Sequence, residues 1–519
     1  MIDPAEYPPS NLPEAPAITS ESTTRNVARN TLIMFGAQIL TFGLTFIWTV
    51  VIQHKLGDAN VGRLFTAQSL AWIGMVFMDA GVATYLAKQV ARERGNTTRL
   101  LGTAYALRAI STMVVYAAIL CIAHILGYDG ATQIAAVLVG ASVMAGSFTQ
   151  ATAAGFQGHE EMKWPALGNI AEKLTITTVT VILLFAGYGL LAVASVMLVG
   201  ALANLAVVGI LAWRRGWVKI QFNFPLMKSL LAGGAPFFLW ASFGVIYQRN
   251  SALQLAALTD PATTGHFGAA TRMYETLSFV LYIFQTAVLP VLSRTFVQST
   301  DQMQRTARRS FELIIMAALP IGAGVTLLSP QIIDLVTERS QFVGSIVPLR
   351  ILGISLLPLY VDMILAMILI SVDKQKQWGY VAVFAAVINP VLNWLLITWT
   401  DARYHNGAIG AAIVTLFTEV MIFFFYIFLI PRDILNRGTV ITAGKFIVAT
   451  AGMGLSLWLM LPVFNAYSPN GGTGKVGAAA VLIMSSVGGA CIYLGLAWLL
   501  RAVGADDIRL LRKALTRGR

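Results

Sequence analysis

Long apolar runs recur from one end of this chain to the other, and they constrain its fold more than any other feature. Most exceed the ~18 residues with which a helix crosses the hydrocarbon core of a bilayer. A transmembrane β-barrel would instead alternate polar and apolar residues in segments of about ten. We therefore predict an all-α polytopic membrane protein with about 14 transmembrane helices. The predicted spans lie near residues 30–52, 62–86, 101–126, 131–154, 165–186, 189–213, 233–257, 265–292, 310–328, 345–371, 378–399, 407–430, 440–462 and 475–500.

The composition supports this class and excludes several kinds of site. Charged residues make up 12% of the chain, about half of the fraction in soluble domains. Cys121 and Cys491 both fall inside apolar runs, so the sequence predicts neither a disulfide framework nor a metal centre. The five histidines are scattered without the spacing of metal ligands. We expect no cofactor and no metal.

The basic residues divide unequally between the two sides of the predicted membrane protein. If the N-terminus is cytoplasmic, by far the larger share of the 36 Lys and Arg residues falls in cytoplasmic segments, as the positive-inside rule requires. We therefore predict that both termini are cytoplasmic. The net charge of +12 then faces anionic lipid headgroups, and no nucleic-acid partner is expected.

The spacing of the apolar runs divides the chain into two similar lobes with additions at both ends. An acidic, Pro-rich N-terminal tail is expected to be disordered. A basic linker separates two six-helix lobes around a central cleft, related by an axis along the membrane normal as in transporters with parallel repeats. A basic C-terminal tail is expected to lie on the cytoplasmic surface as a helix. The boundaries are 1–29 for the first tail, 30–219 and 220–437 for the lobes, 438–503 for two extra helices and 504–519 for the last tail.

Two arginines stand out in the hairpin formed by the seventh and eighth spans. Arg249 and Arg272 lie on opposite sides of a break at Asp260 and Pro261, which places both roughly 10–14 Å below the turn. A charge at such depth costs about 2.5–3.5 kcal/mol even on the mildest scale. We interpret both as anion-binding groups that line a transport path. The alternatives are a structural pair between Arg249 and an acid on another helix, and pairing of Arg272 with Glu275 on its own helix face.

Other polar residues within spans are candidates for binding, gating or coupling. Lys173 is expected to face the cleft, pointing away from Glu172, and Asp79 with Arg108 forms either an ion pair within the first lobe or a gate. Asp362 and Glu419 are buried acids that either carry a coupling proton or serve packing and pairing. Amide, hydroxyl and aromatic groups suited to hydrogen-bond sugars are Gln38, Thr41, Thr45, Gln68, Ser69, Tyr247, Gln248, Asn389 and Asn393.

Several segments resemble the polysaccharide-transport branch of the MATE-like (multidrug/oligosaccharidyl-lipid/polysaccharide) exporter superfamily. The first is Phe77–Ala91, which contains an aromatic-x-Asp-x-Gly signature, and the second is Ala154–Lys163. The order of three later segments is similar to that in Wzx-type flippases of lipid-linked oligosaccharides; these are Ser371–Lys376, Val387–Ile397 and Gly407–Glu419. The chain departs from the pattern at Arg249, where the resemblance leads us to expect an acidic residue in many relatives.

The resemblance implies a specific activity. A relative of this kind moves undecaprenyl-pyrophosphate-linked oligosaccharide repeat units across the bacterial inner membrane by alternating access, for assembly of O-antigen, capsule or exopolysaccharide. Arginine suits such a cargo because its charge is permanent and its forked donors match phosphate. The expected partners are the lipid-linked oligosaccharide, the bilayer lipids and a polysaccharide polymerase or export machinery.

Three alternative functions are left to compare. A multidrug or cation antiporter of the same superfamily would have acidic groups as the dominant cavity charges, and a lipid II flippase would share the diphosphate-lipid cargo. A membrane glycan polymerase or ligase would need a long outward loop with catalytic groups, whereas the outward loops here are short. We therefore predict a transporter and not an enzyme.

Overall fold

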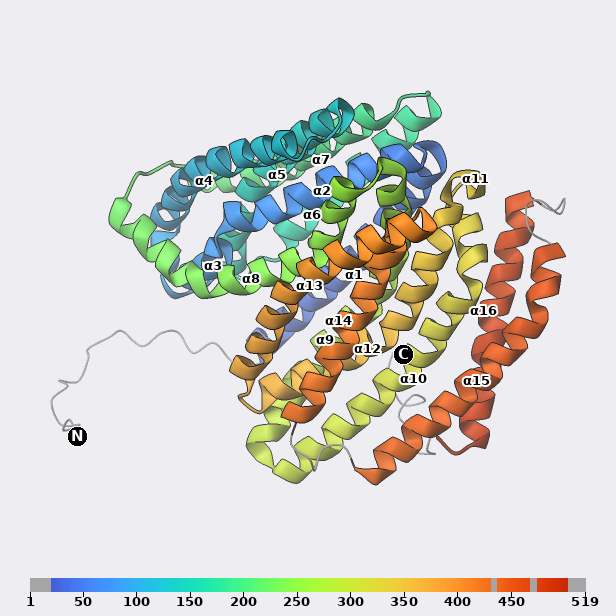
Figure 1. Cartoon of the computed structure of the whole chain (residues 1–519). Helices are drawn as coiled ribbons and strands as arrows, with labels where there is room; N and C mark the ends of the chain where they lie inside the picture. Colours follow the sequence, from blue (N-terminus) through green and yellow to red (C-terminus); the bar gives the residue numbers. More distant parts are fainter. Residues whose placement is uncertain (1–19, 431–435, 467–473, 503–519) are drawn as a thin grey trace.

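The computed structural model describes residues 20–430, 436–466 and 474–502, and long helices dominate all three ranges. Within them, thirteen helices are long and apolar enough to cross a membrane, and α9 is a further helix of 38 residues. The prediction of an all-α polytopic membrane protein is confirmed. Figure 1 shows two helical bundles, with a separate helix pair at one edge.

The first lobe follows from the first six apolar runs. Its second run is broken, because Ala80 and Gly81 both adopt left-handed backbone angles between two helical pieces. A left-handed backbone conformation is unfavourable for a non-glycine residue such as Ala80, so the packing around the break must stabilise it. The elements are α1 (Ser20–Lys55), α2 (Asp58–Asp79), α3 (Val82–Arg92), η1 (Arg94–Asn96), α4 (Thr97–Ile125), α5 (Gly130–Gly158), α6 (Lys163–Phe185) and α7 (Leu190–Arg214).

The second lobe begins with two long helices joined by a two-residue turn. Its centre is α12, which packs against α9, α10 and α14 and is the most deeply buried of the spans. The elements are α8 (Phe224–Leu258), α9 (Pro261–Gln298), α10 (Thr300–Val336), α11 (Arg339–Phe342), η2 (Val343–Ser345), α12 (Ile346–Ser371), α13 (Gln375–Tyr404) and α14 (Gly407–Leu429).

The last two helices lie outside both lobes. α15 (Arg437–Ala466) and α16 (Gly474–Leu499) pack on each other and on α10, and Figure 1 shows them side by side at one edge. Tyr493 of α16 donates to the carbonyl of Met316 of α10 at 2.9 Å. This contact anchors the pair to the second lobe.

One tail prediction is wrong in part. The acidic tail was expected to extend to residue 29, but α1 already begins at Ser20. A helix nucleated by an apolar span extends readily into preceding polar residues, because each added residue gains a backbone hydrogen bond. Residues 1–19 and the basic tail at 504–519 lie outside the described residues.

Helix α8 is shared between the two lobes. Its first half packs on α3, where a Cβ atom on Gly234 would lie 2.8 Å from the carbonyl oxygen of Ala80. Its second half packs on α13. The absence of a side chain at Gly234 therefore lets α8 approach the break between α2 and α3 at backbone distance. Pro236 follows inside the same helix, where a proline removes a helical hydrogen bond.

Candidate functional site

The turn between α8 and α9 places the two predicted arginines on facing helices. Asp260 caps α9 by accepting from the backbone nitrogens of Ala262 and Thr263 at 2.8 and 3.0 Å, and Pro261 occupies the first helical position. Burial tends to raise the pKa of Asp260, but the hydrogen bonds from Thr263 and Ala262 outweigh burial and hold the pKa below its usual value. The carboxylate therefore stays ionised at neutral pH and keeps the turn short.

Arg272 extends from α9 into the first lobe. Its guanidinium donates to Oε1 of Gln68 on α2. The guanidinium carbon lies 5.4 Å from the ring centre of Trp48 on α1 and 5.9 Å from that of Phe65 on α2. These are cation–π distances. No carboxylate pairs directly with Arg272 among the described salt bridges.

Arg249 lies on α8 and pairs with Glu275 of α9. Its Nη1 is 2.9 Å from Oε1 of Glu275, and its guanidinium carbon is 6.0 Å from the ring centre of Trp72 on α2. The predicted alternative that paired Arg249 with an acid on another helix is therefore confirmed, and the alternative that joined Glu275 to Arg272 on one helix face is wrong. The rotation of α8 brings Arg249 to the same carboxylate, and an arginine fork can meet it across the helix pair.

The two arginines, taken together, form one cationic cluster between the lobes. Both belong to helices of the second lobe, and their aromatic neighbours Trp48, Phe65 and Trp72 belong to the first. Glu275 balances one of the two charges. The cluster thus retains a net positive charge where the two lobes meet, which suits an anionic ligand.

Asn389, predicted as a sugar-binding residue, is instead engaged inside the second lobe. Its Oδ1 accepts from Asn393 at 2.8 Å and from Asn250 of α8 at 3.2 Å, and its amide donates to Thr418 of α14 at 3.4 Å. Gln254 donates to the carbonyl of Pro390 at 3.0 Å. This buried network ties α8 to α13 and α14, and its members hydrogen-bond one another within the lobe.

The two predicted coupling acids lie close together, deep in the second lobe. Tyr247 of α8 donates to Oε1 of Glu419 at 2.9 Å, so Tyr247 joins the acids and not the arginine cluster. Neither oxygen of Asp362 meets a conventional hydrogen-bond donor in the described part of the chain, and its neighbour is the carboxyl group of Glu419. Two carboxylates in such proximity repel each other unless a proton or a metal cation lies between them.

Three other predicted residues do not join the cluster. Lys173 does not point away from Glu172, because its Nζ lies 3.2 Å from Oε1 of that residue; that prediction is wrong. Glu172 also accepts from Asn204 of α7 at 2.7 Å, so Lys173 is part of a polar group on α6 and α7. Gln38 and Gln248 are both exposed on their helices.

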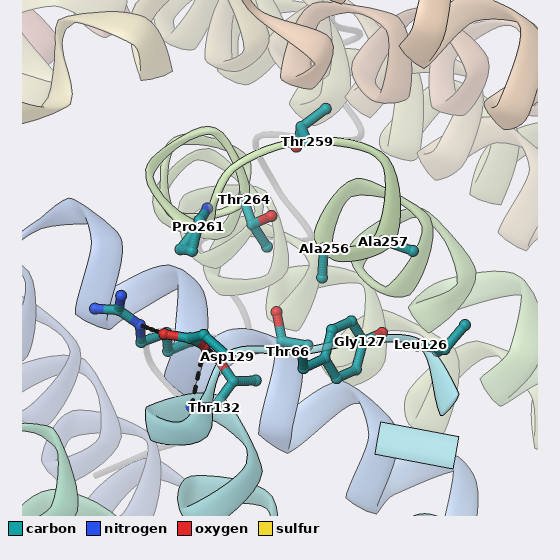
Figure 2. Close-up of a pocket in the computed structure, with 12 residues that line it drawn as sticks. Thr66, Leu126, Gly127, Asp129, Thr132, Ala256, Ala257, Thr259, Pro261 and Thr264 are labelled. Atoms are coloured by element: carbon teal, nitrogen blue, oxygen red, sulfur yellow. Dashed lines mark hydrogen bonds and ion pairs between the residues drawn. The ribbon is translucent and has the colours of Figure 1, made fainter. Parts of the chain in front are cut away.

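At the end of the molecule that carries the α8–α9 turn, which we call the far end, the lobes are in backbone contact. A Cβ atom on Gly62 of α2 would overlap the carbonyl oxygen of Pro261 and lie 2.7 Å from the backbone nitrogen of Gly265. Next to this contact lies a cavity of about 290 Å³ between the α8–α9 turn, α2 and the loop that precedes α5. Figure 2 shows Pro261 and Thr264 on one side and Thr66 and Asp129 on the other.

The two charged residues that line the far-end cavity have opposite signs. Arg63 and Asp129 form an ion pair at 2.7 Å across its wall. Burial tends to raise the pKa of Asp129, but hydrogen bonds from Thr132 and Arg63, with the charge of Arg63, outweigh burial and lower it. The cavity therefore lacks the net positive charge that distinguishes the arginine cluster.

Comparisons with known proteins decide the family. The model of the family described as "Polysaccharide biosynthesis protein" matches residues 27–296, more than half of the chain. The chain belongs to this polysaccharide biosynthesis family. A second model, MatE, matches residues 248–395. The predicted resemblance to Wzx-type members of the MATE-like exporter superfamily is thereby confirmed, and so is the prediction of a transporter rather than an enzyme.

Curated relatives of this family member are named as a transporter and a flippase. It is 24% identical to a putative O-antigen transporter of Escherichia coli over 278 residues, 51% of the chain and 63% of that protein. It is 22% identical to a probable low-salt glycan biosynthesis flippase of Haloferax volcanii, over 75% of the chain and 80% of that protein. The chain thus spans less than two thirds of the O-antigen transporter that it matches.

Solved structures share the fold. The lipid II flippase MurJ in an inward closed conformation superposes with a TM-score of 0.68 at 13% identity, over 90% of this chain and 98% of MurJ. An inward-facing multidrug MATE transporter superposes with a TM-score of 0.63 at 14% identity, over 77% of this chain and 97% of that one. Both show that the polysaccharide biosynthesis family member has the two-lobed exporter fold.

The other predicted charged pair lies inside the first lobe of the family member. Asp79, at the end of α2, and Arg108 of α4 form an ion pair. The Arg108 side chain is 1% exposed, and Ser147 of α5 accepts from it at 3.5 Å. Both partners belong to one lobe, so this geometry favours a structural ion pair over a gate between lobes.

Loss of the Asp79 charge should destabilise the protein strongly. Asp79→Asn leaves the buried Arg108 without its counter-ion, which typically costs about 3–5 kcal/mol. The matched control is Glu160→Gln, because Glu160 and its partner Arg94 are 64% and 52% exposed and such pairs contribute about 0–1 kcal/mol. Thermal unfolding of both variants in detergent measures the difference. Equal melting temperatures would show that Arg108 does not depend on Asp79.

The sequence interpretation missed the aromatic side of the cluster. Trp48, Phe65 and Trp72 contact the arginines, but in the sequence they are indistinguishable from core residues of apolar helices. A weak signal was present: tryptophan is enriched at the membrane interfaces, whereas Trp72 lies well inside α2. A tryptophan in that position suggests a polar neighbour.

Proposed function

We propose that this protein is a flippase for oligosaccharides linked to a lipid diphosphate, undecaprenyl pyrophosphate in bacteria. The observation that carries the proposal is the cationic cluster of Arg249 and Arg272, with its net positive charge between the lobes. A diphosphate head drawn into the membrane needs permanent cations and several donors, and two guanidinium groups supply both. The aromatic residues around them offer flat surfaces to the adjoining sugar.

The direction of transport follows from the proposed orientation. The segments richest in Lys and Arg lie at the end opposite the far end, and the positive-inside rule makes that end cytoplasmic. The contact between Gly62 and Pro261 then closes the outer side. The better superposition on an inward-facing exporter than on an outward-facing one, with TM-scores of 0.63 and 0.50, supports a state that receives cargo from the cytoplasm.

Alternating access then requires the far-end contact to break while the opposite end closes. The cargo head enters from the cytoplasmic side and displaces part of the Arg249 and Arg272 contacts. The lobes rock around the cluster, and the glycan leaves at the far end while the lipid chain stays in the bilayer. We propose the pair of Asp362 and Glu419 as the coupling site, because a cation bound there relieves the repulsion of two buried carboxylates.

Of the two alternative cargoes, only the cationic drug is less suited to this geometry. A multidrug antiporter that takes cationic drugs would need a negative cavity, and the cluster between the lobes is positive. Lipid II carries the same diphosphate lipid, so the arginine cluster accommodates it equally well. Discrimination between lipid II and a longer glycan must come from contacts to the sugars.

Reconstitution tests the proposed function directly. Purified protein in proteoliposomes should move a fluorescent undecaprenyl-pyrophosphate oligosaccharide between leaflets, and empty liposomes should not. Lipid II and a cationic dye serve as competing cargoes in the same vesicles. An imposed proton or sodium gradient identifies the coupling ion, and Asp362→Asn should remove that dependence. Transport of the dye without transport of either diphosphate lipid would refute the proposal in favour of a drug exporter.

A further inference from the structure

Glu275 is a carboxylate in the middle of a site that we propose for an anion. Its Oε1 lies 2.9 Å from Nη1 of Arg249. It follows Arg272 by one helical turn and acts electrostatically on that guanidinium too. Its side chain is 38% exposed, so packing does not lock it in place. A negative charge in this position opposes the binding of a diphosphate and requires an explanation.

Glu275 has a role when no cargo is bound at the arginine cluster. Without a counter-ion, Arg249 would be an unpaired charge within the membrane span, which is costly. Glu275 satisfies Arg249 when no cargo is present. A diphosphate competes for the same guanidinium donors, since both anions accept the same forked hydrogen bonds. The carboxylate of Glu275 and the diphosphate of the cargo therefore cannot both form a complete set of hydrogen bonds with Arg249.

We propose that Glu275 is a tethered competitor, which occupies Arg249 between transport cycles and yields it to the diphosphate of the cargo. The inference rests on the proposed function and concerns the same site. The cargo gains only the difference between its own contact with Arg249 and the contact that Glu275 gives up. Return of Glu275 to Arg249 then promotes release of the cargo on the outer side. This positioning residue thereby keeps the affinity for the cargo low enough for repeated transport cycles.

The arrangement around the pair allows such an exchange. Arg272 keeps Gln68, Trp48 and Phe65 as partners that do not depend on Glu275. The cargo can therefore bind Arg272 first while Arg249 is still paired. The acids of the second lobe do not replace Glu275 in this role, because Glu419 is bound by Tyr247 and Asp362 lies beside it.

Binding of inorganic pyrophosphate to the purified full chain tests the competitor. Glu275→Gln keeps the shape of the side chain and removes its charge, so pyrophosphate should bind about 10-fold tighter or more, as measured by calorimetry. In proteoliposomes the same variant should show a lower KM and a lower kcat, because release becomes slow. A residue that only stabilised the fold would not lower KM. The matched control Glu160→Gln removes an exposed acid from the loop between α5 and α6 and should leave the affinity, KM and kcat unchanged.

The outcomes separate the inference from the proposed function. Equal pyrophosphate affinity in Glu275→Gln and the parent, with normal turnover, overturns the competitor while the arginine site stands. Absence of binding in both overturns the arginine site and the competitor with it. If Glu275→Gln does not fold, Glu275→Asp provides the test. Its shorter carboxylate meets Arg249 less well, so an intermediate affinity is expected, and an unchanged one contradicts the competitor.

Discussion

Replacement of Arg272 by alanine should abolish the proposed export of a lipid-linked glycan while the protein still inserts and folds. The guanidinium is the one cation of the cluster without a carboxylate in direct contact among the described residues, so it has the most to offer an incoming diphosphate. Truncation of a desolvated, hydrogen-bonded charge costs about 2–5 kcal/mol of binding, which corresponds to about 30-fold weaker binding or more. Flipping rates in proteoliposomes, with thermal unfolding as the check on folding, measure the effect.

Two companion variants make the Arg272 result specific. Arg272→Lys keeps the charge but loses the planar fork and its stacking on Trp48 and Phe65, so its rate should fall between those of the parent and the alanine variant. Arg305→Ala removes an exposed arginine on α10 and should leave transport within two-fold, roughly the effect of a surface substitution. Normal export by Arg272→Ala would remove the arginine cluster from the mechanism.

The helices were predictable because their signal is local. Apolar runs of membrane length identify spans without knowledge of neighbouring helices, and each predicted span has a counterpart in the structure. The ends were less predictable. α10 extends from Thr300 to Val336, beyond both limits of the predicted 310–328, since polar residues continue a helix once an apolar span has nucleated it.

The partners of the charged residues were the least predictable part. The spacing of Arg272 and Glu275 suggests a contact within one helix, yet Glu275 meets Arg249 of the neighbouring helix. The choice depends on how α8 and α9 rotate against each other, and packing over the whole lobe decides that rotation. The same reason explains why the prediction for Asn389 differs from the structure. From the sequence its amide is a candidate to bind a sugar, but in the structure it hydrogen-bonds Asn250 and Thr418.

The second large effect that we expect concerns the far-end contact of Gly62 with the backbone of Pro261 and Gly265. Gly62→Ala places a methyl group where the carbonyl oxygen of Pro261 now lies, and backbone cannot move aside as a flexible side chain can. Overpacking of this kind typically costs about 1–3 kcal/mol, which shifts the equilibrium between closed and open far ends about 5- to 150-fold. The closed state that receives cargo then becomes scarce, and transport should fall by a similar factor.

Disulfide cross-linking across the far end detects the predicted opening. Cysteines in place of Asp58 on α2 and His266 on α9, whose side chains lie 3.5 Å apart, with Cys121 and Cys491 changed to serine, should cross-link readily in the parent and slowly with Gly62→Ala. Gly244→Ala is the matched control, because a Cβ atom on Gly244 of α8 meets nothing within 4 Å; it should leave both cross-linking and transport unchanged. Rapid cross-linking and normal transport with Gly62→Ala would mean that the lobes do not separate at Gly62 and Pro261 during transport. Slow cross-linking with lost transport would identify the contact of Gly62 with Pro261 as the outer gate, because the substitution adds only one methyl group, and that group lies between α2 and α9.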